Sequence, residues 1–152
     1  MKIIYSCYWG SYLAVVAASL HLRHIEEKTD ILALPLFNNI KDNELGELIR
    51  VGTDENGREI FVIGSKKSAK ILAKTLDGIS QIYGFSAGSI LFVDLNHLYN
   101  FLIRLGIFLI RRLKLITIGK RLILMGICKN HEKLINIVQS VRDKPVYKED
   151  EA

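Results

Sequence analysis

Strands and helices are expected to alternate along this chain of 152 residues, which predicts an α/β fold. We expect a mostly parallel sheet, helices on both faces and one β-hairpin. Short β-branched and aromatic runs precede longer runs in which apolar residues recur at helical spacing. An Asn-Gly pair between two apolar runs is typical of a hairpin turn. The length fits a single domain, residues 1–144, and the charged segment 145–152 is expected to be a disordered tail.

The first strand and the first helix are expected at the N-terminus. Residues 2–6 (KIIYS) form a β-branched and aromatic run that predicts a strand. After a turn, Ser11 is a candidate N-cap for a largely buried helix over 12–23. Residues 26–43 are more polar, and Pro35 interrupts any helix there, so this segment is expected to be irregular or helical in short pieces.

The hairpin is the clearest local signal in the sequence. Residues 48–53 and 59–64 are two apolar runs joined by Asp-Glu-Asn-Gly, and Asn-Gly adopts positive φ at little cost. A helix is expected over 67–83, because its apolar residues share one stripe. Gly84 is expected to end that helix.

The C-terminal half is expected to add two strands and two helices. Residues 89–93 (SILFV) form a continuously apolar run, suited to the interior of a sheet. A strongly apolar helix is expected over 96–113, then a last strand over 121–127 and a last helix over 131–142. The polar residues of the 96–113 helix share one narrow face: His97, Asn100, Arg104 and Arg111. Its apolar remainder is expected to be buried in the core or partly covered by a partner.

Two features of the composition restrict the location and the metal content. The chain has two cysteines, Cys7 and Cys128, without the spacing of a zinc site, so we expect reduced thiols, a cytoplasmic location and no metal. No run supplies the roughly 20 consecutive apolar residues of a transmembrane helix, so no membrane span is expected.

The net charge of +5 is unevenly distributed. Between residues 95 and 131 no acidic residue accompanies the seven basic ones, which are Arg104, Arg111, Arg112, Lys114, Lys120, Arg121 and Lys129. Such a segment attracts anionic partners. Nucleic-acid binding through the basic stretch 104–129 is one interpretation. A solvated basic face is preferred, because aromatic residues are not interleaved with the basic ones.

Ligand sites in open parallel sheets lie beyond the carboxyl ends of the strands, and this rule indicates four segments of the chain. They are residues 7–12, 64–67, 94–97 and 126–131. A small anionic ligand at these segments is one interpretation, although no phosphate-loop motif is present. The candidate ligand-binding residues are Tyr8, Gly10, Ser11, Tyr12, Ser65, Lys66, Lys67 and His131.

Three residues are candidates for catalysis, each with a structural alternative. Cys7 near a helix N-terminus could be a nucleophile, but a phosphatase loop requires Arg at the position of Leu13, so a buried, inert thiol is preferred. Asp94 and His97 could form an acid/base pair. Asp94 is more simply the N-cap of the next helix.

Four runs resemble one bacterial family, that of domain of unknown function 3189. They are ILALPLF (31–37), VGTDENGREIFVIG (51–64), ILFVD (90–94) and RLGIFLIRRLKLITIGKRLILMG (104–126). The likeness spans nearly the whole chain in order. No activity is established for this family, so the resemblance implies a fold and not a reaction.

The turn after the first strand departs from the family's pattern. Members of the family have a His-Cys-Tyr-Gly-Gly-like turn followed by His-Ser-Ser. This chain keeps Cys7, Tyr8 and Gly10 and differs at Ser6, Trp9, Tyr12, Leu13 and Ala14. We therefore expect bulky side chains to fill this bend, and the resemblance implies that any family activity there is lost or altered.

Three functions follow as hypotheses. The leading one is a non-catalytic binding or interaction domain, which pairs with itself or with a relative through the helix 96–113. The alternative is a small enzyme or a nucleotide- or phosphate-binding protein with its site at the strand ends. The third is nucleic-acid binding through 104–129. Whether the chain is an enzyme, and which cofactor it uses, stay open.

Overall fold

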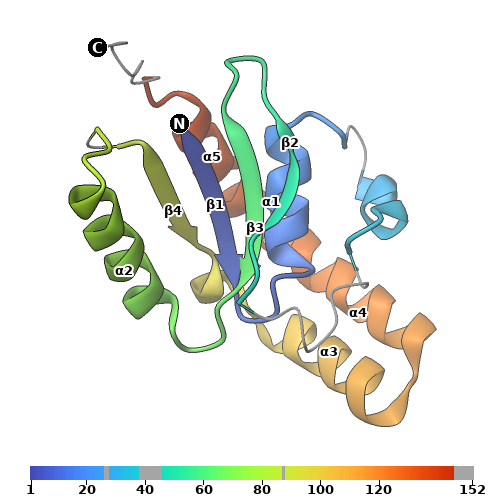
Figure 1. Cartoon of the computed structure of the whole chain (residues 1–152). Coiled ribbons are helices and arrows are strands. Elements are labelled where there is room, and N and C mark those ends of the chain that lie inside the picture. Colours follow the sequence, from blue (N-terminus) through green and yellow to red (C-terminus); the bar gives the residue numbers. More distant parts are fainter. Residues whose placement is uncertain (26–27, 38–45, 87, 146–152) are drawn as a thin grey trace.

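The computed structural model describes residues 1–25, 28–37, 46–86 and 88–145. In this part of the chain, four strands form one sheet in the order β2-β3-β1-β4 (Figure 1). β1 (Lys2–Cys7) pairs in parallel with β3 (Glu59–Gly64) on one side and with β4 (Ile90–Asp94) on the other. β2 (Ile49–Thr53) pairs antiparallel with β3. The mixed α/β class, the mostly parallel sheet and the hairpin are confirmed, and helices on both faces stay a prediction.

The central strand is β1, and the expectation that residues 89–93 occupy the sheet interior is wrong. β1 is buried from Ile3 to Cys7, whereas β4 lies at the edge and its apolar residues are only half-buried. A continuous apolar run indicates burial on both faces of a strand. It carries no information about how many neighbours pair with that strand.

The hairpin turn has the conformation that its sequence favours. Gly57 has φ of 75°, and the Asp54 carboxylate accepts hydrogen bonds from the main-chain N–H groups of Asn56 and Arg58, both at 2.9 Å. The Asp54 side chain therefore stabilises the main-chain conformation of the turn.

Two of the predicted helices pack against strands of the sheet. α1 (Leu13–His21) is buried except for Leu20, and it contacts β1, β3 and α5 (His131–Arg142). α2 (Ala69–Ile82) packs on β4, and Gly84 follows it with φ of 67°. The polar segment after α1 contains a short 3-10 helix, Lys28–Ala33. Of the predicted tail only Pro145 lies within the described residues.

The predicted strand over 121–127 is wrong, because these residues lie inside a helix, α4 (Ile116–Lys129). α4 packs antiparallel on α3 (Phe101–Leu113) to form a helical hairpin (Figure 1). Glycines allow this close approach: a Cβ atom on Gly106 would lie 2.6 Å from the carbonyl oxygen of Gly119, and one on Gly119 would lie 2.7 Å from that of Gly106. An apolar run of this length fits either a strand or a buried helix, and the partner helix decides between them.

The helix expected over 96–113 begins later than its apolar pattern suggests. Residues Asn96–Leu98 form a separate 3-10 turn, and Asn100 caps α3 by accepting a hydrogen bond from the main-chain N–H of Ile103 at 3.0 Å. His97 is therefore not on the polar face of α3, and Asp94 is not its N-cap. None of the helices in the described ranges is long and apolar enough to cross a membrane.

Candidate functional site

A hollow of about 820 Å³ opens at the carboxyl ends of the parallel strands. Tyr8 directly follows β1, Lys66 follows β3 by two residues, and Asp94 ends β4, and all three line this hollow. The other walls come from the start of α2 and from α3, which contributes Arg104, Ile107, Phe108, Arg111 and Arg112. We call it the strand-end hollow.

The topology explains why the hollow forms at this place. The chain passes from β1 to β3 on one side and returns to β4 on the other side of β1. Open parallel sheets bind ligands at such a reversal, because the loops on either side diverge and leave a crevice.

Main-chain hydrogen bonds fix the loops that form the floor. The N–H of Ser65 donates to the carbonyl of Cys7 and that of Lys66 to the carbonyl of Tyr8, both at 3.0 Å. Below them, the Ser6 hydroxyl donates to the Ser65 hydroxyl at 2.7 Å, and both residues are buried. The loops after β1 and β3 are therefore held together before any ligand enters.

Positive charge dominates the lining. Six cationic side chains line the hollow, namely Lys66, Lys67, Lys70, Arg104, Arg111 and Arg112. Among the described residues, the only carboxylate in the lining is Asp94. Its side chain accepts a hydrogen bond from the main-chain N–H of Asn96 at 3.0 Å. Within the described ranges no ion pair forms on Lys66, Lys67, Lys70, Arg104 or Arg112. An anion entering the hollow would therefore meet charges that no ion pair in the described part of the chain compensates.

Lys66 has a strained main chain. Its φ is 47°, in the left-handed region that side chains other than those of Gly, Asn and Asp adopt at a cost of about 1 kcal/mol. The hydrogen bond to Tyr8 holds this conformation, and the amide of Asn96 donates to the Lys66 carbonyl at 3.5 Å. A lysine at a position where glycine would be less strained is consistent with a role of the Lys66 side chain in the hollow.

The aromatic residues of the bend after β1 line the hollow and leave it open. Tyr8 and Trp9 meet edge to face with ring centroids 5.0 Å apart, and the Arg111 guanidinium lies 3.8 Å from the centroid of the Trp9 ring. Tyr12 is instead buried and packs edge to face on Phe37. The expectation that bulky side chains fill this bend is therefore wrong. Of the two bulky aromatic residues that depart from the family's pattern, Tyr12 is buried in the core and Trp9 lines the wall of the hollow.

Cys7 lies beneath the hollow as a protonated thiol. It is fully buried, donates to the carbonyl of Ser11 at 3.0 Å and accepts from the Tyr99 hydroxyl at 3.5 Å. Burial raises the pKa of the Cys7 thiol and that of the Tyr99 hydroxyl above their ordinary values. A thiol held in this form is a poor nucleophile.

The structure separates the other two catalytic candidates. Asp94 lines the strand-end hollow, whereas His97 is exposed and lines a second hollow of about 500 Å³ with Asn130 and Lys133. Among the candidate ligand-binding residues, Tyr8, Lys66 and Lys67 line the strand-end hollow. The remaining candidates do not line it: Gly10, Ser11, Tyr12 and Ser65 are buried, and His131 begins α5.

Several lining residues were not among the candidates, and one signal in the sequence could have indicated those on α3. Arg104, Ile107, Phe108 and Arg111 recur at steps of three or four, so they share one face of a helix. The side toward which α3 turns this face depends on the α3–α4 packing, which the sequence does not disclose.

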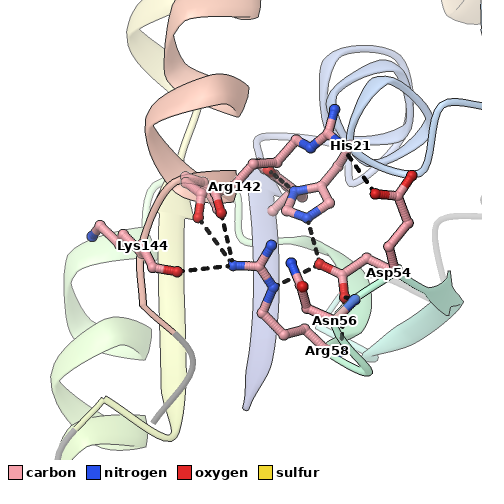
Figure 2. A network of polar contacts seen from close by, with 9 residues as sticks. His21, Asp54, Asn56, Arg58, Arg142 and Lys144 are labelled. Atoms are coloured by element: carbon pink, nitrogen blue, oxygen red, sulfur yellow. Dashed lines mark hydrogen bonds and ion pairs between the residues drawn. The ribbon is translucent and has the colours of Figure 1, made fainter.

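A second polar cluster lies at the opposite end of β1 and is built as a structural tie (Figure 2). The Arg58 side chain is 1% exposed, and its Nε donates to Asp54 Oδ2 at 2.6 Å. Its Nη1 donates to the carbonyls of Val141, Arg142 and Lys144 at 3.2–3.4 Å. Arg58 thus satisfies the carbonyls at the C-terminus of α5 and ties this helix to the hairpin.

His21 completes this cluster in its neutral form. Asp54 can only accept, so Nε2 of His21 carries the proton and donates to Asp54 Oδ2 at 3.1 Å, and Nδ1 accepts from the Tyr5 hydroxyl at 2.8 Å. Burial lowers the pKa of His21 below its ordinary value. Burial alone would raise the pKa of Asp54, but hydrogen bonds from the Arg58 main chain and from the His21 and Arg58 side chains lower it.

No metal centre is apparent in the described ranges, which contain no group of three or more His, Cys, Asp or Glu side chains that could hold an ion. The adjoining space at the His21 cluster measures about 80 Å³, too little for an organic ligand.

Comparison with known proteins gives one match. The family model described as "Protein of unknown function (DUF3189)" matches residues 2–143. No curated protein matches the chain, and no solved structure matches it. Because the match covers nearly the whole chain, as the four resembling runs predicted, the protein belongs to the DUF3189 family.

Proposed function

We propose that the chain is a non-catalytic binding domain that takes a phosphate-bearing small molecule in the strand-end hollow. The observation that carries this proposal is the charge of the lining, where six cations face a single carboxylate among the described residues. Five of these cations, all except Arg111, form no ion pair within the described ranges. Like charges repel one another, and a ligand with several negative charges relieves that repulsion.

Phosphate groups fit this set of cations better than a single carboxylate does. Arg104 and Arg112 present planar guanidinium groups that bind phosphate oxygens in pairs. Lys66, Lys67 and Lys70 add point charges around the start of α2. Together they match a diphosphate or triphosphate.

The aromatic wall favours a ligand that also carries a ring. Tyr8, Trp9 and Phe108 line the hollow beside the cations. A volume of about 820 Å³ is within the range of small-molecule sites and exceeds what a phosphate group alone requires. A nucleotide has both parts.

The lining offers little for catalysis. Cys7 is buried and protonated, and His97 lies in a different hollow from Asp94. The Asp94 carboxylate is engaged by the Asn96 main chain. Among the lining residues that the structure describes, no nucleophile is paired with a base, which favours binding without chemistry.

The test is calorimetric titration of the full chain with ATP, inorganic pyrophosphate and adenosine. We expect ATP to bind most tightly, pyrophosphate more weakly and adenosine not measurably, with ATP recovered intact. Arg104→Gln should weaken ATP binding, whereas Arg121→Gln removes an exposed arginine that does not line the hollow and should leave the affinity unchanged. Absence of heat with ATP and pyrophosphate, or equal loss in both variants, contradicts the proposal.

Pairing through residues 96–113 is a weaker candidate for the main function. Ile103, Gly106 and Ile107 are buried in the chain itself, and the first two contact α4. Several apolar side chains of this segment are therefore buried within the chain itself and are not free to contact a partner. Binding of nucleic acid through 104–129 stays a prediction. The titrations with adenosine and pyrophosphate do not test it.

A further inference from the structure

The turn between α3 and α4 carries a group of exposed aliphatic side chains that we call the hairpin tip. It consists of Leu113, Leu115, Ile116 and Ile118, which are between 45% and 55% exposed. The α3–α4 hairpin projects beyond the sheet, and this turn lies at its outer end (Figure 1). Scattered apolar side chains are ordinary on a surface, but four within six residues at a projecting end form a patch.

The hairpin tip is a folded turn. Lys114 ends α3 with φ of 55°, and the main-chain N–H of Leu115 donates to the carbonyl of Leu109 at 3.1 Å. The N–H of Gly119 donates to the carbonyl of Leu115 at 2.9 Å and so begins α4. Because these hydrogen bonds set the main chain, the aliphatic side chains are held outward, and their exposure does not come from a frayed end.

The charges around the hairpin tip favour an anionic partner over a second copy of the chain. Arg112, Lys114 and Arg121 are exposed around it, and no acidic residue occurs between residues 95 and 131. A second copy docked tip to tip would place these cations against one another. An anionic phospholipid surface instead offers phosphates to the cations and an acyl boundary to the aliphatic side chains.

We propose that the hairpin tip inserts into the interface of an anionic membrane. The projecting shape fits a lipid surface, which closes around a protruding turn, better than it fits a flat protein surface. None of the helices in the described ranges is long and apolar enough to cross a membrane. The proposed association is peripheral and depends on both the aliphatic side chains and the cations. This proposal does not rest on ligand binding in the strand-end hollow.

The test is co-sedimentation of the full chain with vesicles. We expect binding to vesicles of phosphatidylcholine and phosphatidylglycerol at about seven to three, and little binding to phosphatidylcholine alone. The double variant Ile116→Gln with Ile118→Gln should lower the partition coefficient roughly tenfold or more. The control is Ile71→Gln with Ile82→Gln, two α2 side chains that are 68% and 81% exposed, and it should bind as the parent does.

A charge variant tests the second half of the proposal. Lys114→Asn with Arg121→Gln removes two cations, and Asn tolerates the positive φ of residue 114. We expect weaker binding to the anionic vesicles, and circular dichroism should show an unchanged helix content. Light scattering of the parent without lipid should give a monomer.

Four outcomes would overturn the proposal: no binding to anionic vesicles, equal binding to neutral vesicles, equal loss in the α2 control, or a dimer that Ile116→Gln with Ile118→Gln dissociates. A Lys66→Asn variant separates the two proposals, because it should lose pyrophosphate affinity and keep vesicle binding.

Discussion

The guanidinium of Arg111 lies 3.8 Å from the centroid of the Trp9 ring, so α3 is joined to the bend that follows β1. This contact joins two parts of the wall of the strand-end hollow, which the cations of α3 and the lysines after β3 also line. A cation on an indole face is stabilised by the ring's negative quadrupole. Trp9 is the only tryptophan of the chain, so its fluorescence reports on this site alone.

Gly10 is expected to be essential for the loops below the hollow. Its φ is 74°, and a Cβ atom there would lie 2.6 Å from the main-chain nitrogen of Gly64. Gly10→Ala should lower the free energy of unfolding by about 2 kcal/mol or more, as measured by urea denaturation. The control is Gly57→Ala, which has φ of 75° with no atom within 4 Å and should cost about 1 kcal/mol. Equal losses would show that crowding at Gly64 is unimportant.

Arg58 is expected to stabilise the contact between the hairpin and α5. Arg58→Met removes the hydrogen bonds to the carbonyls of Val141, Arg142 and Lys144 and leaves the Asp54 carboxylate without its closest cation. We expect a loss of about 3 kcal/mol or more in the free energy of unfolding. Arg50 is exposed, and Arg50→Met should cost about 0.5 kcal/mol or less. A comparable loss for both variants would contradict this role.

The stability of the protein should fall as the pH is lowered below the ordinary pKa of histidine. Burial lowers the pKa of His21 from 6.5 in the folded chain, so below 6.5 the unfolded chain binds the additional proton first. Stability is therefore full above that pH and decreases below it. The lowered pKa of Asp54 adds a further decrease below 3.8, where the unfolded carboxyl is protonated.

Chemical denaturation at several pH values measures this dependence. His21→Gln should flatten the slope between about pH 7 and pH 5, because Gln takes no proton there. A parent whose stability rises on acidification through this range would contradict the neutral state of His21.

The thiols are expected to differ in reactivity. Cys7 is fully buried with a raised pKa, whereas Cys128 is half-buried. A disulfide reagent should therefore modify Cys128 first and Cys7 only on unfolding. Native Cys128→Ser protein should not react on the time scale of Cys128 in the parent. Rapid reaction of Cys7 in that variant would indicate an activated thiol and would reopen the enzyme hypothesis.

The predictions that held are those that depend on neighbours in sequence. The hairpin follows from Asn56-Gly57, and β1 follows from a short β-branched run. The strand expected over 121–127 failed because its signal was local, whereas Gly106 and Gly119 determine its helical pairing from opposite sides of a turn. The pattern of apolar and polar residues identifies a buried segment, but the residues that pack against the segment determine whether it is a strand or a helix.

The position of the strand-end hollow could be predicted from the sequence, whereas much of its lining could not, and ligand binding there stays a prediction. The strand-end rule indicated Tyr8, Lys66 and Lys67, because these residues follow predicted strands along the chain. That they line one hollow depends on the order of the strands in the sheet, which the sequence does not disclose. Arg104 and Arg111 join them only because the α3–α4 hairpin places one face of α3 toward the sheet's carboxyl end. Arg58 was missed because one charged residue in a hairpin gives no sign of the distant carbonyls that it binds.

The most direct test of anion binding is a titration of Trp9 fluorescence with inorganic pyrophosphate. We predict a saturable change in emission, because the anion competes for the Arg111 guanidinium that covers the indole. Lys66→Asn should weaken the binding about three- to tenfold. The matched control is Lys114→Asn, which removes the same charge at a similar φ outside the hollow and should leave the affinity unchanged. No saturable change in the parent, or an equal effect of both variants, would contradict ligand binding in the strand-end hollow.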